Sequence, residues 1–158
     1  MNENIKATGH IAWELTRADG TVEKGEKPNV VTNYGKQWMA SVLGTGATTV
    51  VWFGFGTSSA AATGVSVTDT SLYTELGSGI SYARVIPTRS ATSGSAVVTY
   101  VGSITGVSSS VAVPQTIREV GIFPASTGNT IIAHQGTGDV ALTSVNDSLQ
   151  ITWQITFS

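Results

Sequence analysis

Hydrophobic and polar positions alternate most clearly over residues 149–157. Apolar side chains occupy every second position there, at Leu149, Ile151, Trp153, Ile155 and Phe157, with Gln or Thr between them. Successive side chains of a β-strand point to opposite faces of a sheet, so this period of two predicts a strand with one buried face and one face in water.

A β-hairpin is predicted over residues 9–27. Apolar residues alternate at Ile11, Trp13 and Leu15, residues 18–21 supply a turn signal, and residues 22–27 form a return strand. Charged residues of both signs occur at strand spacing on the two arms. This pattern is typical of a solvated face with cross-strand ion pairs.

One helix is predicted, over about residues 33–43. Residues 28–32 continue the extended chain before it, Asn33 is the expected N-cap, and Gly44 is the expected stop. We expect this helix to close over one sheet with a single apolar face, made of Tyr34, Trp38, Met39, Val42 and Leu43.

The rest of the chain reads as short strands separated by segments rich in Gly, Ser and Thr. A strand buried on both faces is predicted at 49–55, followed by a small-residue loop at 57–67 and a short helical turn at 68–76, capped by Asp69. Further strands are predicted at 80–87, 96–104, 109–113 and 118–124, with a second hairpin that runs through 126–129 to 130–134.

This spacing predicts an all-β fold, mainly an antiparallel β-sandwich or barrel, jelly-roll-like, with the one short helix. A length of 158 residues is that of one domain, so we expect a single β-rich domain over 1–158 with an N-terminal hairpin arm at about 1–32.

The composition indicates a polar surface with few charges. Charged residues are 11% of the chain, whereas 23 Thr and 18 Ser carry hydroxyls. The net charge of -2 provides no broad field for nucleic acid or anionic lipid, and the four Lys all lie within residues 1–36. Cysteine is absent, which excludes disulfides and thiolate sites.

Neither a membrane span nor an export signal is predicted. The most apolar run, residues 50–55, is far shorter than the roughly 20 residues of a membrane-spanning helix. Residues 1–6 lack a basic segment followed by an apolar one, so we expect no secretory signal.

Candidate catalytic groups are few, and we expect no catalytic residues, cofactor or metal. His10 and His134 have no metal-ligand spacing, and no Gly-x-Ser-x-Gly element is present. Gly54 and Gly56 lack the third glycine and the following helix of a dinucleotide site. An enzyme is therefore disfavoured.

The acidic residues have structural interpretations. Asp139 and Asp147 lie in turn-like contexts, where Asp bonds its own backbone. Glu119 lies within an apolar strand, so we expect a buried structural carboxylate whose partner is Arg84, Arg89 or backbone amides.

Five segments, in this order, resemble small virion proteins of tailed bacteriophages. The segments are 29–35 (Asn-Val-Val-Thr-Asn-Tyr-Gly), 54–57 (Gly-Phe-Gly-Thr), 68–76 (Thr-Asp-Thr-Ser-Leu-Tyr-Thr-Glu-Leu), 118–123 (Arg-Glu-Val-Gly-Ile-Phe) and the alternating 149–157. The resemblance covers about residues 11–157. It implies a β-rich structural module found in capsid decoration (cement) proteins, head fibres and tail or baseplate fibres, without catalytic residues.

Within that group we expect a non-enzymatic accessory protein that binds an assembled capsid. The resemblance implies the major capsid protein and copies of the chain itself as partners, most often in a trimer, with neither nucleic acid nor membrane. The expected location is the outer surface of the virion, after synthesis in the host cytoplasm.

The charge-rich residues 1–36 are the expected capsid-facing contact, because they alone offer charges of both signs. The candidate contact residues are Lys6, Trp13, Glu14, Arg17, Lys24 and Lys27.

The alternative is receptor recognition by a protein associated with the tail or baseplate fibre, with exposed aromatic rings stacked on host sugars. Trp52 and Trp153 lie in core-like patterns, so Trp13 and Trp38 are the candidates for that role.

Overall fold

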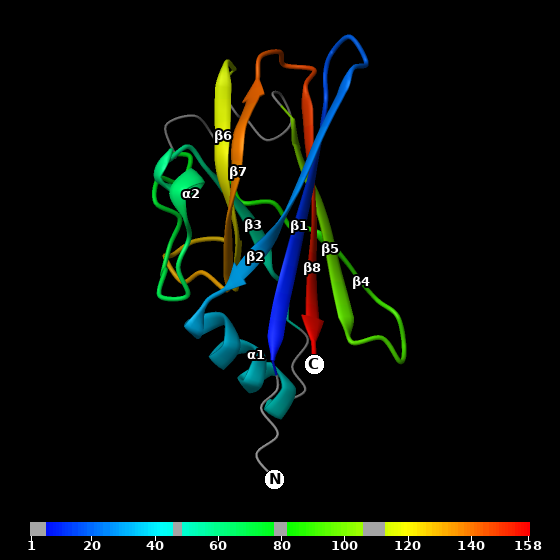
Figure 1. Cartoon of the computed structure of the whole chain (residues 1–158), viewed down its shortest axis with the longest axis vertical. Coiled ribbons are helices and arrows are strands. Elements are labelled where there is room, and N and C mark those ends of the chain that lie inside the picture. Colours follow the sequence, from blue (N-terminus) through cyan, green and yellow to red (C-terminus); the bar gives the residue numbers. More distant parts are fainter. Residues whose placement is uncertain (1–5, 46–48, 78–81, 106–112) are drawn as a thin grey trace.

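A computed structural model describes residues 6–45, 49–77, 82–105 and 113–158. Its strands form an eight-stranded antiparallel sheet that curls into a half-barrel, in the order β3-β6-β7-β2-β1-β8-β5-β4 (Figure 1). The predicted all-β class is confirmed, with 50% strand and 12% helix. The strands are β1 (Ala7–Thr16), β2 (Val22–Val31), β3 (Trp52–Gly56), β4 (Thr88–Ala91), β5 (Val97–Thr105), β6 (Gln115–Phe123), β7 (Ala133–Leu142) and β8 (Ser148–Phe157).

The predicted N-terminal hairpin is present and its strands are longer than expected. β1 and β2 pair from Gly9 opposite Asn29 to Thr16 opposite Val22. β8 pairs with the other edge of β1, and β7 pairs with β2 at Val30 and Val31. The hairpin is therefore part of the sheet, between β7 and β8: β1 pairs with β8 along its whole length, whereas β2 pairs with β7 only at its last two residues.

The alternation predicted for the last strand is confirmed. Leu149, Ile151, Trp153 and Ile155 of β8 are buried on the inner face of the curled sheet, and Phe157 is half-buried. Trp153 packs near Phe53 of β3, with ring centroids 6.2 Å apart, so β8 and β3 share one core although they are distant in strand order. The polar residues of β8 point to the outer face.

A connector, residues 57–77, covers the outer face of β6 and β7. It contains α2 (Ala60–Thr63), which packs on β7 and β6 (Figure 1). Leu72 of the connector forms a second apolar cluster with Phe123 and Ile131, with Trp52 packed against it. β6 is consequently buried on both faces from Glu119 to Phe123.

A single stretch of chain links the two edges of the curled sheet. Val85 exchanges backbone hydrogen bonds of 2.7 and 3.0 Å with Phe53 of β3, one edge strand. A few residues later the chain becomes β4, which pairs with β5 at the opposite edge. Residues 82–91 thus bring the ends of the half-barrel together.

The predicted helix is α1 (Asn33–Thr45), which lies at the end of the sheet where β2 ends (Figure 1). Thr32, not Asn33, is the N-cap, because its hydroxyl accepts a 3.0 Å hydrogen bond from the N–H of Gly35. Met39 is buried as expected, but Tyr34 is exposed because it lies on the solvent side of the first turn. The side chain of Leu43 lies outside the described part of the chain.

Several predicted elements differ from those observed. The segment 68–76 is not helical, because Asp69 bonds His134 and the N–H of Ser66 instead of capping a turn. A short helix, α2, lies in the predicted loop 57–67. Of the strand predicted at 80–87, residues 80 and 81 lie outside the described chain, and residues 82–87 contain only an isolated bridge at Val85. The strand in this region is β4, which begins just after the predicted one.

The C-terminal half holds the largest difference. β7 continues to Leu142, whereas the prediction ended that strand at residue 134. Asp139 therefore lies in a strand and not in a turn. The turn-like sequence around Asp139 comes from Gly138, whose φ is +82°. The pairing of β7 with β6 is also irregular in this region, where it contains a register shift. Of the strand predicted at 109–113, residues 109–112 lie outside the described chain and Val113 is not in a strand.

Among the residues described, no helix combines the length and hydrophobicity that a membrane span requires.

Candidate functional site

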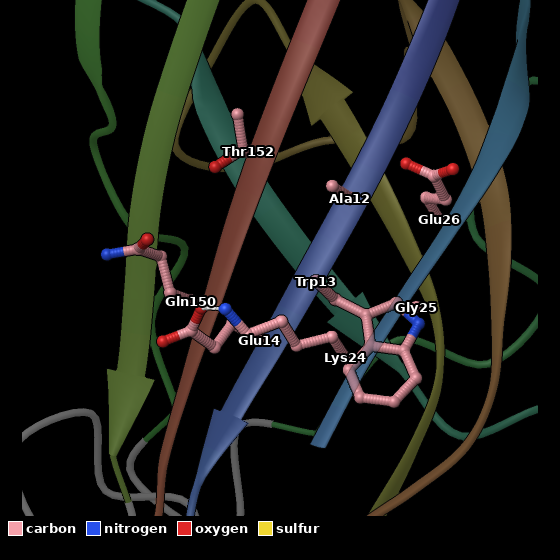
Figure 2. Close-up of a pocket in the computed structure, with 8 residues that line it drawn as sticks. All are labelled: Ala12, Trp13, Glu14, Lys24, Gly25, Glu26, Gln150 and Thr152. Atoms are coloured by element: carbon pink, nitrogen blue, oxygen red, sulfur yellow. Dashed lines mark ion pairs between the residues drawn. The ribbon is translucent and has the colours of Figure 1, made fainter. Parts of the chain in front are cut away.

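Two of the predicted contact residues lie opposite each other on the outer face of the hairpin. Glu14 of β1 and Lys24 of β2 are cross-strand partners, and the Lys24 Nζ lies 2.8 Å from the Glu14 carboxylate (Figure 2). Both side chains are exposed, at 42% and 68%. The charges of such an exposed pair remain hydrated, so the pair contributes little to stability and stays accessible to a binding partner.

A pocket of about 430 Å³ surrounds this pair. The register places residues of β2, β1 and β8 side by side on the outer face, because Glu26 lies opposite Ala12, and Gln150 lies opposite Glu14. The pocket offers carboxylate, ammonium, amide and hydroxyl groups on one open face. Its lining residues are Ala12, Trp13, Glu14, Lys24, Gly25, Glu26, Gln150 and Thr152 (Figure 2).

Strand alternation directs Trp13 and Lys27 toward the other face of the hairpin, although the ring of Trp13 also reaches the pocket. The indole of Trp13 lies over Gly25, where an added Cβ would come within 2.5 Å of the ring, and it packs against the core. Lys27 is opposite the buried Ile11. Trp13 is half-buried, and the part of its ring that stays accessible lines the pocket around Glu14 and Lys24.

Lys6 and Arg17 lie at opposite ends of β1. Lys6 extends the ladder of β1 by exchanging backbone hydrogen bonds with Ser158. Arg17 follows β1 and donates to the carboxylates of Glu23 and Asp147. The structure therefore brings Glu14, Lys24 and the edge of Trp13 together at one pocket, and it places Lys6, Arg17 and Lys27 outside that pocket.

Asp147 joins the turn of the first hairpin to the turn before β8. Its side chain accepts hydrogen bonds from the backbone N–H of Ala18, Thr143 and Ser144, as expected of an Asp in a turn. Burial raises the pKa of this carboxyl, but those hydrogen bonds outweigh burial, so its pKa falls from 3.8 to about 2. The carboxylate stays ionised and structural.

A buried polar cluster lies where the connector crosses β6 and β7. The ring of His134 places Nδ1 2.8 Å from Asp69 Oδ2 and Nε2 2.9 Å from Glu119 Oε2. His134 and Glu119 are both fully buried. Tyr73 packs the edge of its ring against His134, with centroids 5.0 Å apart.

Glu119 is a buried structural carboxylate, as expected from its position in an apolar strand. Backbone N–H groups of Tyr73 and Thr74 donate to its two oxygens at 3.0 and 2.8 Å. Burial raises its pKa, but the hydrogen bonds from His134 and from these two amides outweigh burial and lower it. Backbone amides are thus confirmed as its partners, and Arg84 is not one of them.

Arg84 instead joins the connector to the end of β6 and the loop that follows it. Its guanidinium forms a two-point contact with Glu75, at 2.7 and 2.8 Å, and donates to the carbonyls of Ala125 and Gly128. It also lies 3.4 Å from the centre of the Phe123 ring. The Arg84 side chain is 4% exposed, so its charge is used for internal contacts.

The chemistry available to these groups is limited. Over the described ranges, no group of three or more His, Asp or Glu side chains is arranged to hold a metal ion. His10 is exposed and lies 3.7 Å from Glu26. Sequence spacing gives no signal for the His134 cluster, because its members come from a connector and two strands.

The other tryptophans offer no flat exposed ring. Trp153 is fully buried, and Trp52 and Trp38 are half-buried against apolar clusters.

Comparison of the chain with protein-family models, with curated proteins and with solved structures finds no match.

Proposed function

We propose that this chain is a non-enzymatic structural protein of a tailed-bacteriophage virion, and that it binds the outside of the assembled capsid as a decoration protein. One observation carries the proposal. Three of the segments through which the chain resembles virion proteins, 54–57, 68–76 and 118–123, are mutual structural partners.

The contacts between these segments are specific. The N–H of Leu76 donates to the carbonyl of Phe55, and the N–H of Thr57 donates to the carbonyl of Thr74, both at 2.9 Å. Glu119 receives the amides of Tyr73 and Thr74. Gly56 leaves the space that Glu119 and Thr74 occupy, because a Cβ there would lie about 2.5 Å from them. This supports reading the motifs as one structural module and not as separate coincidences.

The described titratable groups support a binding role over a catalytic one. In the cluster around His134, the ring and the Glu119 carboxylate are fully buried, and the cluster fastens the connector to the sheet. Accessible polar groups of both charges surround Glu14 and Lys24 on the outer face, where mixed charges favour docking on a complementary protein surface.

The proposed mechanism is mechanical. A chain that binds neighbouring capsid subunits only when they are assembled stabilises the shell by mass action. We propose that the outer face of the hairpin, centred on Glu14 and Lys24, meets the capsid, and that copies of the chain associate as trimers.

The test uses capsids of the phage that carries this gene, purified from a deletion mutant. The purified chain should bind them at a fixed ratio and raise their melting temperature. Lys24→Glu should lower occupancy, whereas Lys36→Glu, a matched charge reversal on α1, should leave it unchanged. Absence of binding would refute the proposal, and copurification with tails alone would favour the receptor-binding alternative.

A further inference from the structure

The connector is fastened to the sheet through one buried histidine. His134 projects from β7 toward the connector, with a carboxylate oxygen within 2.9 Å of each ring nitrogen. A neutral imidazole carries one N–H and one lone pair, so it donates to only one of two carboxylates. Both contacts are favourable together only when the ring carries two protons.

Loss of one proton would affect the two contacts unequally. Glu119 is fully buried in β6, so water cannot replace the ring N–H there. Asp69 is near the surface, with its side chain 10% exposed. The remaining N–H is therefore best placed on Nε2, toward Glu119, and the lone pair of Nδ1 then faces the Asp69 carboxylate and repels it.

The contacts described for the ring come from two elements. The connector presents Asp69 and Tyr73 to the ring, and β6 presents Glu119. The neighbouring α2 and the paired end of β2 (Val30 and Val31) carry no titratable side chains. Asp69 also accepts the N–H of Ser66 at 2.8 Å and the hydroxyl of Tyr73, so its displacement disturbs the whole of residues 66–73.

We propose that His134 is a proton-dependent latch, which holds residues 66–73 of the connector on the sheet while its ring is an imidazolium and loosens them when the ring loses a proton. The loosened segment uncovers part of the apolar cluster of Leu72, Phe123 and Ile131. This inference does not depend on the proposed virion role.

The test is hydrogen exchange of the full chain at a series of pH values from acidic to alkaline, resolved by peptide and corrected for the intrinsic exchange rate at each pH. Exchange of residues 66–73 should become about tenfold faster on the alkaline side, the size expected for losing a hydrogen bond to a charged group. Exchange in β8 should keep its protection. Nitrogen-15 spectra of the His134 ring should show two N–H groups on the acidic side and one on the alkaline side.

Two variants separate a latch from a passive contact. Asp69→Asn should greatly reduce the pH response of residues 66–73, because its uncharged amide removes the carboxylate charge that the imidazolium attracts and the neutral ring repels. His134→Gln should leave them loosened at every pH. His10→Gln, which changes the exposed histidine, and Asp139→Asn, which changes an exposed aspartate, should both behave like the unmodified chain.

Protection of residues 66–73 that does not vary with pH in the unmodified chain would overturn the proposal. So would a single ring N–H on His134 throughout the range, or an Asp69→Asn variant that keeps the original pH response. If His134→Gln does not fold, the Asp69→Asn comparison still decides the question.

Discussion

The backbone N–H of Ala18 donates a 3.0 Å hydrogen bond to the side chain of Asp147, 129 positions later in the chain. This bond joins the turn between β1 and β2 to the turn between β7 and β8. The same carboxylate receives the N–H groups of Thr143 and Ser144. One buried side chain thus fixes two turns relative to each other.

Asp147→Asn should destabilise the chain by about 2 kcal/mol or more, because an amide replaces a charged acceptor and presents a donor to backbone N–H groups. Urea unfolding followed by tryptophan fluorescence measures the effect. Asp139→Asn is the control, since the side chain of Asp139 is 72% exposed, and its loss should cost little. Equal effects of the two changes would contradict the assigned role of Asp147.

Stability should fall as the solution is acidified from about pH 4 to pH 2. The pKa of Asp147 is lowered in the folded chain, from 3.8 to about 2, and that of Glu119 is also lowered. A lowered folded pKa contributes stability above the ordinary pKa, and the contribution is lost as the pH falls through the folded value. Urea midpoints measured at several pH values check this, and the slope should be shallower in Asp147→Asn.

Two glycines of α1 should respond in opposite directions to alanine. A Cβ on Gly35 would lie 2.0 Å from the carbonyl oxygen of Ile132, whereas a Cβ on Gly44 would meet nothing within 4 Å. We expect Gly35→Ala to destabilise by about 2 kcal/mol through overpacking against backbone. Gly44→Ala should stabilise by about 0.5 kcal/mol through helix propensity. Thermal unfolding of both variants distinguishes packing from propensity.

Thr32→Ala should destabilise by about 1 to 2 kcal/mol. The hydroxyl of Thr32 caps α1 through Gly35 and donates to the carbonyl of Ile131 at 2.6 Å. Thr32→Ser keeps the hydroxyl and should retain most of the stability. If the serine variant were as unstable as the alanine variant, the cap would not be the source of the effect. Chemical denaturation is the appropriate measurement.

Lys24→Ala should change the free energy of unfolding by less than about 0.5 kcal/mol, because its ion pair with Glu14 is exposed. The measurement is urea unfolding of the purified variant. A near-neutral result would mean that any loss of capsid binding on changing Lys24 comes from the surface itself. A large loss of stability would show that the pair is structural.

Strands with one buried face and one solvent-facing face could be predicted from the sequence, because the alternation of apolar and polar residues is a local pattern. β8 alternates through Trp153, and its burial follows that pattern. The sequence predicts that this strand ends at residue 134, whereas β7 continues to Leu142 through two glycines. Gly136 is instead a close-packing position, where a Cβ would meet the carbonyl oxygen of Ala61 at 2.3 Å. That reason lies in another part of the chain and leaves no local signal.

The candidate contact residues illustrate the same limit. The cross-strand pairing of Glu14 with Lys24 follows from hairpin register, which a turn at residues 18–21 specifies. The inward position of Trp13 also follows from alternation with Ile11 and Leu15. The partners of Glu119 could be predicted only as a class, since His134 and the amides of the connector approach it through tertiary packing.

The position of β8 in the sheet has a consequence for biosynthesis. β8 lies between β1 and β5 and pairs with both. β1 therefore lacks this partner until a strand some 130 residues later in the chain has been synthesised. While residues 148–157 are inside the ribosome, β1 and β5 have no common partner, and the sheet stays divided. Stable folding of this sheet is therefore expected only after β8 has emerged, and until then the unpaired strands are exposed to chaperones.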